Sequence, residues 1–235
     1  MDDETGAVLR AARLRMDEQR VPNRFIALLE AGEVPHDHLR ALAGELYHLV
    51  ESDLRSFALL ASRFPSAPAG DLFLTMAQGE SQALRLLLDF ASALGMDGAD
   101  LAVYEPRPLA QAYPAHLTRT ALHGTRSGIA LALLANAAES GEQYMRVADA
   151  LSKRYGFDEQ AVGHFRFFAD TPAELLDQAA RTLRTGLAEG DDPGEAVRTA
   201  WMVHAYELAF WRTLAEDVVP GRGGADHSRT TKDGR

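Results

Sequence analysis

The spacing of apolar residues constrains this chain to an all-helical fold. Over long stretches, apolar side chains recur every three or four positions, which is the period of a helix that buries one face. The chain is rich in Ala, Leu, Arg and Glu and almost lacks Ile, and it contains no alternating β-branched run that would favour a strand. No repeat or linker divides it, so we expect one helical domain over residues 1–220. The polar tail, residues 221–235, is expected to be disordered.

Turn and capping residues indicate where the helices begin and end. Thr171 before Pro172, and Asp192 before Pro193, have the pattern of an N-cap followed by proline in the first helical turn. The prolines that follow residue 105 predict a loop over residues 96–109. The predicted helices cover residues 5–20, 24–31, 36–63, 71–94, 111–155 with a junction near Gly124, 158–169, a helix that begins at residue 172, and a last helix from residue 193 to about residue 218.

Charge and composition exclude several classes of protein. The formal net charge is -10 and the basic residues are scattered, whereas a nucleic-acid-binding face needs clustered Lys and Arg. The absence of Cys excludes a disulfide framework, a thiolate metal site and a cysteine nucleophile. The acidic N-terminal segment differs from a signal peptide, and no apolar run reaches the roughly 18 residues of a membrane span. We therefore expect a cytoplasmic protein that binds neither nucleic acid nor a membrane.

The long helix predicted over residues 36–63 carries acidic side chains on or near its apolar face. With a turn of about 100° per residue, Asp53 falls in the middle of the apolar stripe and Glu45 falls on its flank. His48 lies beyond this flank, although Glu45 and His48 have the Glu-x-x-His spacing that helical di-iron proteins use for metal ligands. Asp53 needs a partner or a raised pKa if it is buried, unless a bend in the helix lets it reach an Arg or solvent.

The last predicted helix repeats this arrangement, with His204 inside its apolar stripe and Glu207 on the flank. Three interpretations are open. Two Glu–His pairs could hold a metal, His204 could be a satisfied core residue, or the two carboxylates could line a pocket and bind amines or move protons. Because His48 points away from the apolar stripe, we interpret Glu45 as a carboxylate of a pocket wall that faces Glu207.

Several segments resemble the thiaminase II (TenA) family. The segment AYELAFW, from Ala205 to Trp211, resembles the C-terminal Glu-x-x-Phe-Trp signature of that family. The segment EPRPLAQAYPAHLTRTALHGTRSGIALALL, from Glu105 to Leu134, resembles its central stretch of Pro-x-Pro, Tyr-x-x-His, an Arg and an Ala/Leu-rich helix. The resemblance covers most of residues 23–216. It implies a single haem-oxygenase-like helical bundle, in agreement with the all-helical pattern.

The resemblance also implies roles for individual residues. Glu207 matches the catalytic glutamate, which acts as acid and base on the substrate's amino-pyrimidine, and Tyr206 and Trp211 match its aromatic neighbours. The catalytic cysteine of the family falls at Asn136, which cannot form a thiolate, so covalent thiaminase chemistry is expected to be absent. The aspartate that holds the substrate falls at or beside Glu45.

A related branch of the fold consists of di-iron oxidases, which need a full set of Glu, Asp and His ligands. Glu80 matches one ligand, and Glu139 or Glu142 could supply another, but the positions expected to hold His after Glu80 are Ala83 and Leu87. His164 begins a ligand run whose later positions are occupied by other residue types. At most three ligands remain, which is too few for a ferroxidase-type site. We therefore expect no metal and no cofactor.

These observations predict an enzyme without a metal that acts on a compact nitrogen-containing or aromatic metabolite. Glu207 would be the catalytic acid/base, with C–N hydrolysis or a related proton transfer as the reaction. The substrate-binding residues would be Glu45, Tyr113, Asn136, His204 and Tyr206. A ligand-binding protein without activity is the alternative, followed by a di-iron oxidase with a degenerate site. The resemblance also implies a homo-oligomer.

Overall fold

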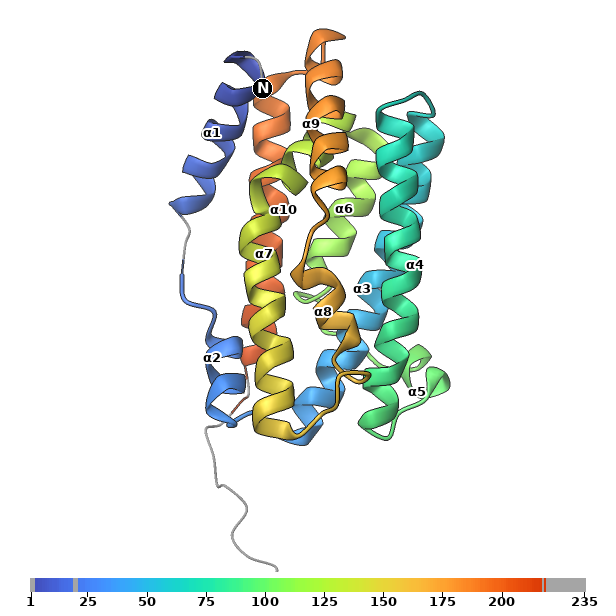
Figure 1. The fold of residues 1–235 in the computed structure, drawn as a ribbon, viewed down its shortest axis with the longest axis vertical. Helices are drawn as coiled ribbons and strands as arrows, with labels where there is room; N and C mark the ends of the chain where they lie inside the picture. Colours follow the sequence, from blue (N-terminus) through green and yellow to red (C-terminus); the bar gives the residue numbers. More distant parts are fainter. Residues whose placement is uncertain (1–2, 19–20, 217, 219–235) are drawn as a thin grey trace, which may run out of the picture.

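A computed structural model describes residues 3–18, 21–216 and 218, and these residues form ten helices and no strand (Figure 1). The prediction of an all-helical fold is therefore confirmed. The expected disordered tail, residues 221–235, lies outside the described residues. The helices are α1 (Asp3–Asp17), α2 (Arg24–Ala31), α3 (His36–Arg63), α4 (Ala69–Ala93), α5 (Gly98–Ala102), α6 (Ala112–His123), α7 (Arg126–Tyr155), α8 (Gly163–Ala169), α9 (Ala173–Ala188) and α10 (Pro193–Ala215).

The long helices form a closed ring around the interior. Helix α3 packs against α4 on one side and α6 on the other, α6 packs against α10, and α10 packs against α7. Helices α8 and α9 contact both α7 and α4, which closes the ring (Figure 1). Each of these helices turns one apolar face inward, so side chains from all of them bound the interior.

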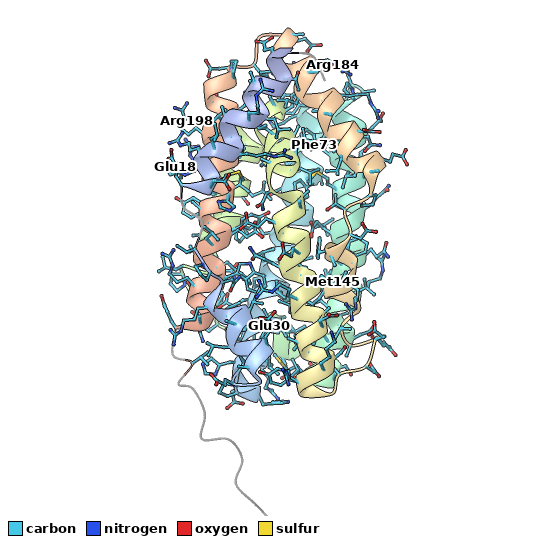
Figure 2. All side chains as sticks on the ribbon, turned by 60° about the vertical axis from the view of Figure 1, so that its left-hand side comes forward. Glu18, Glu30, Phe73, Met145, Arg184 and Arg198 are labelled. Atoms are coloured by element: carbon cyan, nitrogen blue, oxygen red, sulfur yellow. The ribbon has the colours of Figure 1, made fainter. Side chains whose placement is uncertain are left out.

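The interior contains two apolar clusters, one toward each end of the bundle. One cluster includes Phe73 and draws on α1, α6 and α9, and the other includes Phe25 and draws on α2 and α8. Figure 2 shows Phe73 near one end of the bundle, and Glu30 of α2 near the other. Both clusters take residues from α3, α4, α7 and α10. Buried polar side chains on these shared helices include Asp53, Glu80 and Asn136.

Capping residues account for several of the helix boundaries. The structure corrects two of the boundary predictions. Asp192 Oδ1 accepts a hydrogen bond of 2.6 Å from the Glu195 amide, which confirms the predicted cap of α10. The proposed Thr171 cap is wrong by one position, because Pro172 itself is the N-cap residue of α9. Helix α5 lies within the predicted loop, where Asp97 and Asp100 form a capping box that stabilises five helical residues.

Within the described residues, no helix combines the length and the apolar character that a membrane crossing requires.

A close approach at Gly141 fixes where the end of α8 lies against α7. A Cβ atom at Gly141 would lie 2.8 Å from the backbone oxygen of Ala169, well inside normal contact. We expect Gly141→Ala to lower the free energy of unfolding by about 1–3 kcal/mol, measured by denaturant unfolding, because backbone must move. Gly98→Ala is the control, since a Cβ there meets nothing within 4 Å. Equal stability of the two variants would contradict this account.

Candidate active site

A cavity of about 670 Å³ lies between the two apolar clusters, inside the ring of helices. Its volume falls within the ~300–1,000 Å³ range of small-molecule sites. Residues from α3, α4, α6, α7, α9 and α10 line it, together with α8 and the segment between α8 and α9. The wall is largely apolar and aromatic. Its aromatic members are Phe57, Tyr113, Tyr144, Phe167, Phe168, Phe210 and Trp211.

Glu207 of α10 presents its carboxylate to this cavity and is held by two residues of α7. Asn136 Nδ2 donates to Glu207 Oε2, and Ser140 Oγ donates to Oε1 at 3.0 Å. Asn136 and Ser140 lie one helical turn apart, so they reach the same carboxylate. Desolvation raises the pKa of Glu207, although these two hydrogen bonds and nearby His204 act in the opposite direction. The result is a fixed carboxyl group that binds a proton more readily than a free glutamate.

The structure brings Glu207, Asn136 and Tyr113 to the cavity wall, as predicted. It does not bring His204 or Tyr206 there. His204 is buried behind the wall, with its Nε2 3.6 Å from Glu139 Oε2. The ring of Tyr206 packs against His116 at a centroid distance of 5.2 Å. Tyr206 directly precedes Glu207 and therefore leaves α10 in another direction, whereas His204 lies one turn from Glu207 and is directed toward Glu139 of α7.

Glu45 also lies outside the cavity wall, and the expectation that it faces Glu207 is corrected. Glu45 is fully buried and binds the segment between α5 and α6. Its Oε1 accepts hydrogen bonds from the Arg107 amide at 2.7 Å and the Tyr104 hydroxyl at 3.2 Å. Its Oε2 accepts from Gln111 Nε2 at 2.6 Å. A buried carboxylate with three donors is satisfied as a structural anchor.

His48, the histidine of the Glu-x-x-His spacing, contacts the same segment between α5 and α6. His48 Nε2 lies 3.1 Å from the backbone oxygen of Tyr104. The Tyr104 ring rests on Gly44, where a Cβ atom would lie 2.4 Å from the ring. Arg107 then connects this segment to α10 by donating to the Thr213 carbonyl at 2.7 Å. The pattern that resembled a pair of metal ligands therefore holds a loop in place.

Asp53 and Glu80 are two further carboxyl groups in the cavity wall. Asp53 is 3% exposed and Glu80 is 9% exposed, on the adjacent helices α3 and α4. Burial raises the pKa of Asp53 well above its ordinary value, the charge of Glu80 raises it further, and a hydrogen bond from Tyr113 lowers it. Burial raises the pKa of Glu80 to about 8. Asp53 is therefore buried with a raised pKa, which is one of the alternatives that its position in the apolar stripe left open.

Two wall residues, Ser140 and Tyr144, were absent from the predicted site. They follow Asn136 at four-residue intervals on α7, so helical spacing from Asn136 is the signal that could have found them. Burial raises the pKa of Tyr144 well above its ordinary value, and the charges of Glu207, Glu80 and Asp53 raise it further. Tyr144 is therefore a neutral phenol within electrostatic range of all three carboxyl groups.

The residues matched to a di-iron centre do not fit one. Within the part of the chain that the structure describes, no three His, Asp or Glu side chains are placed to hold a metal ion. His164 Nδ1 lies 2.9 Å from the backbone oxygen of Ala83 and is buried among aromatic rings, and Glu142 is exposed on α7. The candidate ligands Glu80, Glu139, Glu142 and His164 thus do not converge.

Glu80 should make the ligand-free protein less stable at higher pH. The pKa of Glu80 is about 8 in the folded chain and its ordinary value is 4.5, so the folded state binds more protons between these values. Its contribution to stability is complete below pH 4.5 and is lost as the pH rises through about 8. We expect Glu80→Gln to flatten the fall in unfolding free energy over this window, measured by urea unfolding at several pH values. An unchanged slope would contradict the assignment.

Known structures share this fold at low sequence identity. A haem-oxygenase-like domain of unknown function from Shewanella denitrificans OS217 is 17% identical with a TM-score of 0.70, covering 93% of this chain and 92% of its own. A TenA homologue from P. horikoshii OT3 is 18% identical with a TM-score of 0.65, covering 89% and 97%. A protein from Sulfolobus solfataricus P2, assigned to the TenA-like thiaminases by its description only, is 14% identical with a TM-score of 0.53, covering 91% and 96%.

These likenesses agree with the all-helical ring and with the predicted haem-oxygenase-like fold, which is confirmed. A comparison with curated protein sequences gives no significant match. The TENA/THI-4/PQQC family model matches residues 16–216, which include all the cavity-lining positions. The chain therefore belongs to the TENA/THI-4/PQQC family.

Proposed function

We propose that this chain is a small-molecule enzyme of the TenA type that uses Glu207 as a general acid/base. Its substrate would be a compact nitrogen-containing or aromatic metabolite, and its reaction C–N hydrolysis or a related proton transfer. One observation carries the proposal. The Glu207 carboxyl group faces an apolar cavity, two neutral donors fix its orientation, and its pKa is raised.

The geometry around Glu207 suits proton exchange at a leaving nitrogen. In C–N hydrolysis, a water oxygen bonds to carbon as the C–N bond breaks, and the leaving nitrogen takes a proton from Glu207. A proton of the water then returns to the Glu207 carboxylate. Asn136 and Ser140 are neutral donors that orient the carboxylate, and their hydrogen bonds offset only part of the rise in its pKa that burial causes. The apolar wall limits competing water.

The proposed reaction contains no covalent enzyme intermediate. Asn136 stands where the resemblance puts the catalytic cysteine, and its amide is bonded to Glu207. The chain has no Cys anywhere that could replace it. A direct attack by water, assisted by Glu207, is therefore the proposed route.

Asn136 also favours a second candidate function, a ligand-binding protein without activity. If the exchange of cysteine for Asn136 removed the reaction, the cavity would still bind the same class of ligand. Thermal-shift measurements over a panel of aminated nitrogen heterocycles, followed by product analysis of each stabilising compound, distinguish the two. Stabilisation with release of an amine or ammonia supports the enzyme. Stabilisation without product supports the binding protein, and no stabilisation by any compound would contradict both.

A further inference from the structure

Two buried carboxyl groups of the cavity wall are not used by the proposed reaction. Asp53 and Glu80 are at least nine-tenths buried, and both line the cavity. Asp53 Oδ1 and Glu80 Oε2 have no hydrogen-bond partner among the described residues. A buried acceptor without a partner is energetically unfavourable, because it has lost its hydrogen bonds to water. This cost is removed if a bound molecule supplies the missing donors.

The part of the cavity wall that the structure describes provides no cation for these groups. The described residues that line the cavity include acidic side chains and no Lys, Arg or His. Asp53, Glu80 and Glu207 also fail to converge on one point where a metal could bind. The compensating charge must therefore come from a proton or from a ligand that carries its own cation.

The cavity wall around the two carboxyl groups indicates which uncharged part such a ligand would have. Aromatic and aliphatic side chains, including Phe57 and Tyr113, surround the two carboxyl groups and favour an apolar or aromatic body. The face of an aromatic ring also attracts an organic cation. A compact organic ammonium ion has both of the required properties.

We propose that Asp53 and Glu80 form an ammonium-binding subsite, which holds a protonated amine of the ligand while another part of the ligand reaches Glu207. The role in positioning a substrate rests on the proposed function. Binding of the ammonium group does not, because it can be measured without turnover. The subsite sets the ligand class as a compact amine with an apolar or aromatic body.

Binding at this subsite should release a proton. At pH 7 the raised pKa values leave a proton on the Asp53–Glu80 pair. A bound ammonium ion supplies the positive charge in place of this proton, which is then released. Tyr113 of α6 and Tyr144 of α7 lie within electrostatic range of both carboxyl groups, and Glu207 of α10 acts on the same two phenols. Asp170 and Glu174 also line the cavity and are exposed. The two phenols remain neutral at this pH because their pKa values are raised far above their ordinary values.

Calorimetric titration of the full chain with benzylamine and with benzyl alcohol tests the proposal. These probes share one apolar body, and only benzylamine carries an ammonium group. We expect benzylamine to bind about tenfold or more tightly, and the double variant Asp53→Asn, Glu80→Gln to lose this preference. Glu51→Gln on α3 is the control for charge, since Glu51 bonds the exposed Arg55. The preference should persist in this control.

A second measurement needs no variant. Titration of the unsubstituted protein with benzylamine in two buffers of different ionisation enthalpy should show proton release on binding. Equal affinity for the two probes, or a preference that survives in the double variant, would overturn the proposal. So would loss of the preference in Glu207→Gln, because Glu207 would then be the ammonium ligand. Tight amine binding without turnover would retain the subsite and reject the proposed enzyme, and turnover without amine preference would do the reverse.

Discussion

Replacement of Glu207 by Gln is expected to lower kcat by about 10²- to 10⁴-fold, the usual contribution of a general acid/base. Gln keeps the size of the side chain and one oxygen acceptor, but it cannot exchange a proton. Asn136 Nδ2 can still donate to the Gln oxygen, and the Ser140 hydroxyl can accept from the new amide group, so the side chain is held in a similar position. Melting curves should show an intact fold, and turnover of a compound identified by the screen gives the rate.

Glu195→Gln is the matched control for this experiment. Glu195 lies in the first turn of the same helix, is half-buried, and has its backbone amide rather than its carboxylate bonded to Asp192. The substitution removes the same charge from α10 without touching the cavity, so turnover should stay at its original level. Full activity of Glu207→Gln would remove Glu207 from the reaction.

Replacement of Glu45 by Ala is expected to lower the free energy of unfolding by about 3 kcal/mol or more. The variant leaves three part-buried donors without an acceptor, on Tyr104, Arg107 and Gln111. The segment between α5 and α6 should then loosen, which denaturant unfolding and hydrogen exchange of these residues would detect. Glu45→Gln should cost less, because its oxygen can still accept from the Arg107 amide.

The control for Glu45 is Glu51→Ala on the same helix. Glu51 bonds Arg55 at 2.6 Å, and Arg55 is 72% exposed, so this pair contributes at most about 1 kcal/mol. If Glu45 bound substrate, its Ala variant would keep the stability of the Glu51 variant and raise KM instead. That outcome would restore the original interpretation of Glu45.

Site residues were predictable where the spacing within a single helix, or the family resemblance, was enough to identify them. Asp53 falls in the apolar stripe of α3 by spacing alone, and its burial follows. Glu207 and Asn136 came from the family resemblance and do line the cavity. Ser140 was within reach of the same reasoning, because it lies one turn from Asn136. Their use in catalysis and binding stays a prediction.

Glu45 shows why the rest could not be predicted. Its place on the flank of an apolar stripe indicated burial, and it is buried. Periodicity gives the direction of a side chain about its helix axis, but it does not say what lies opposite. The segment opposite Glu45 is a loop that is distant in sequence, since Arg107 lies 62 residues from Glu45.

The sequence by itself determined the long helices, most of their boundaries and the position of Asp53 within an apolar stripe, because helical period and capping act over a few residues. The tertiary structure alone decided which buried carboxylates face a loop and which face a cavity. Asp53, Glu80 and Glu207 share one cavity because α3, α4 and α10 are brought into a single ring. The physical reason is that closing the ring depends on non-local packing among all its helices, which no local pattern encodes.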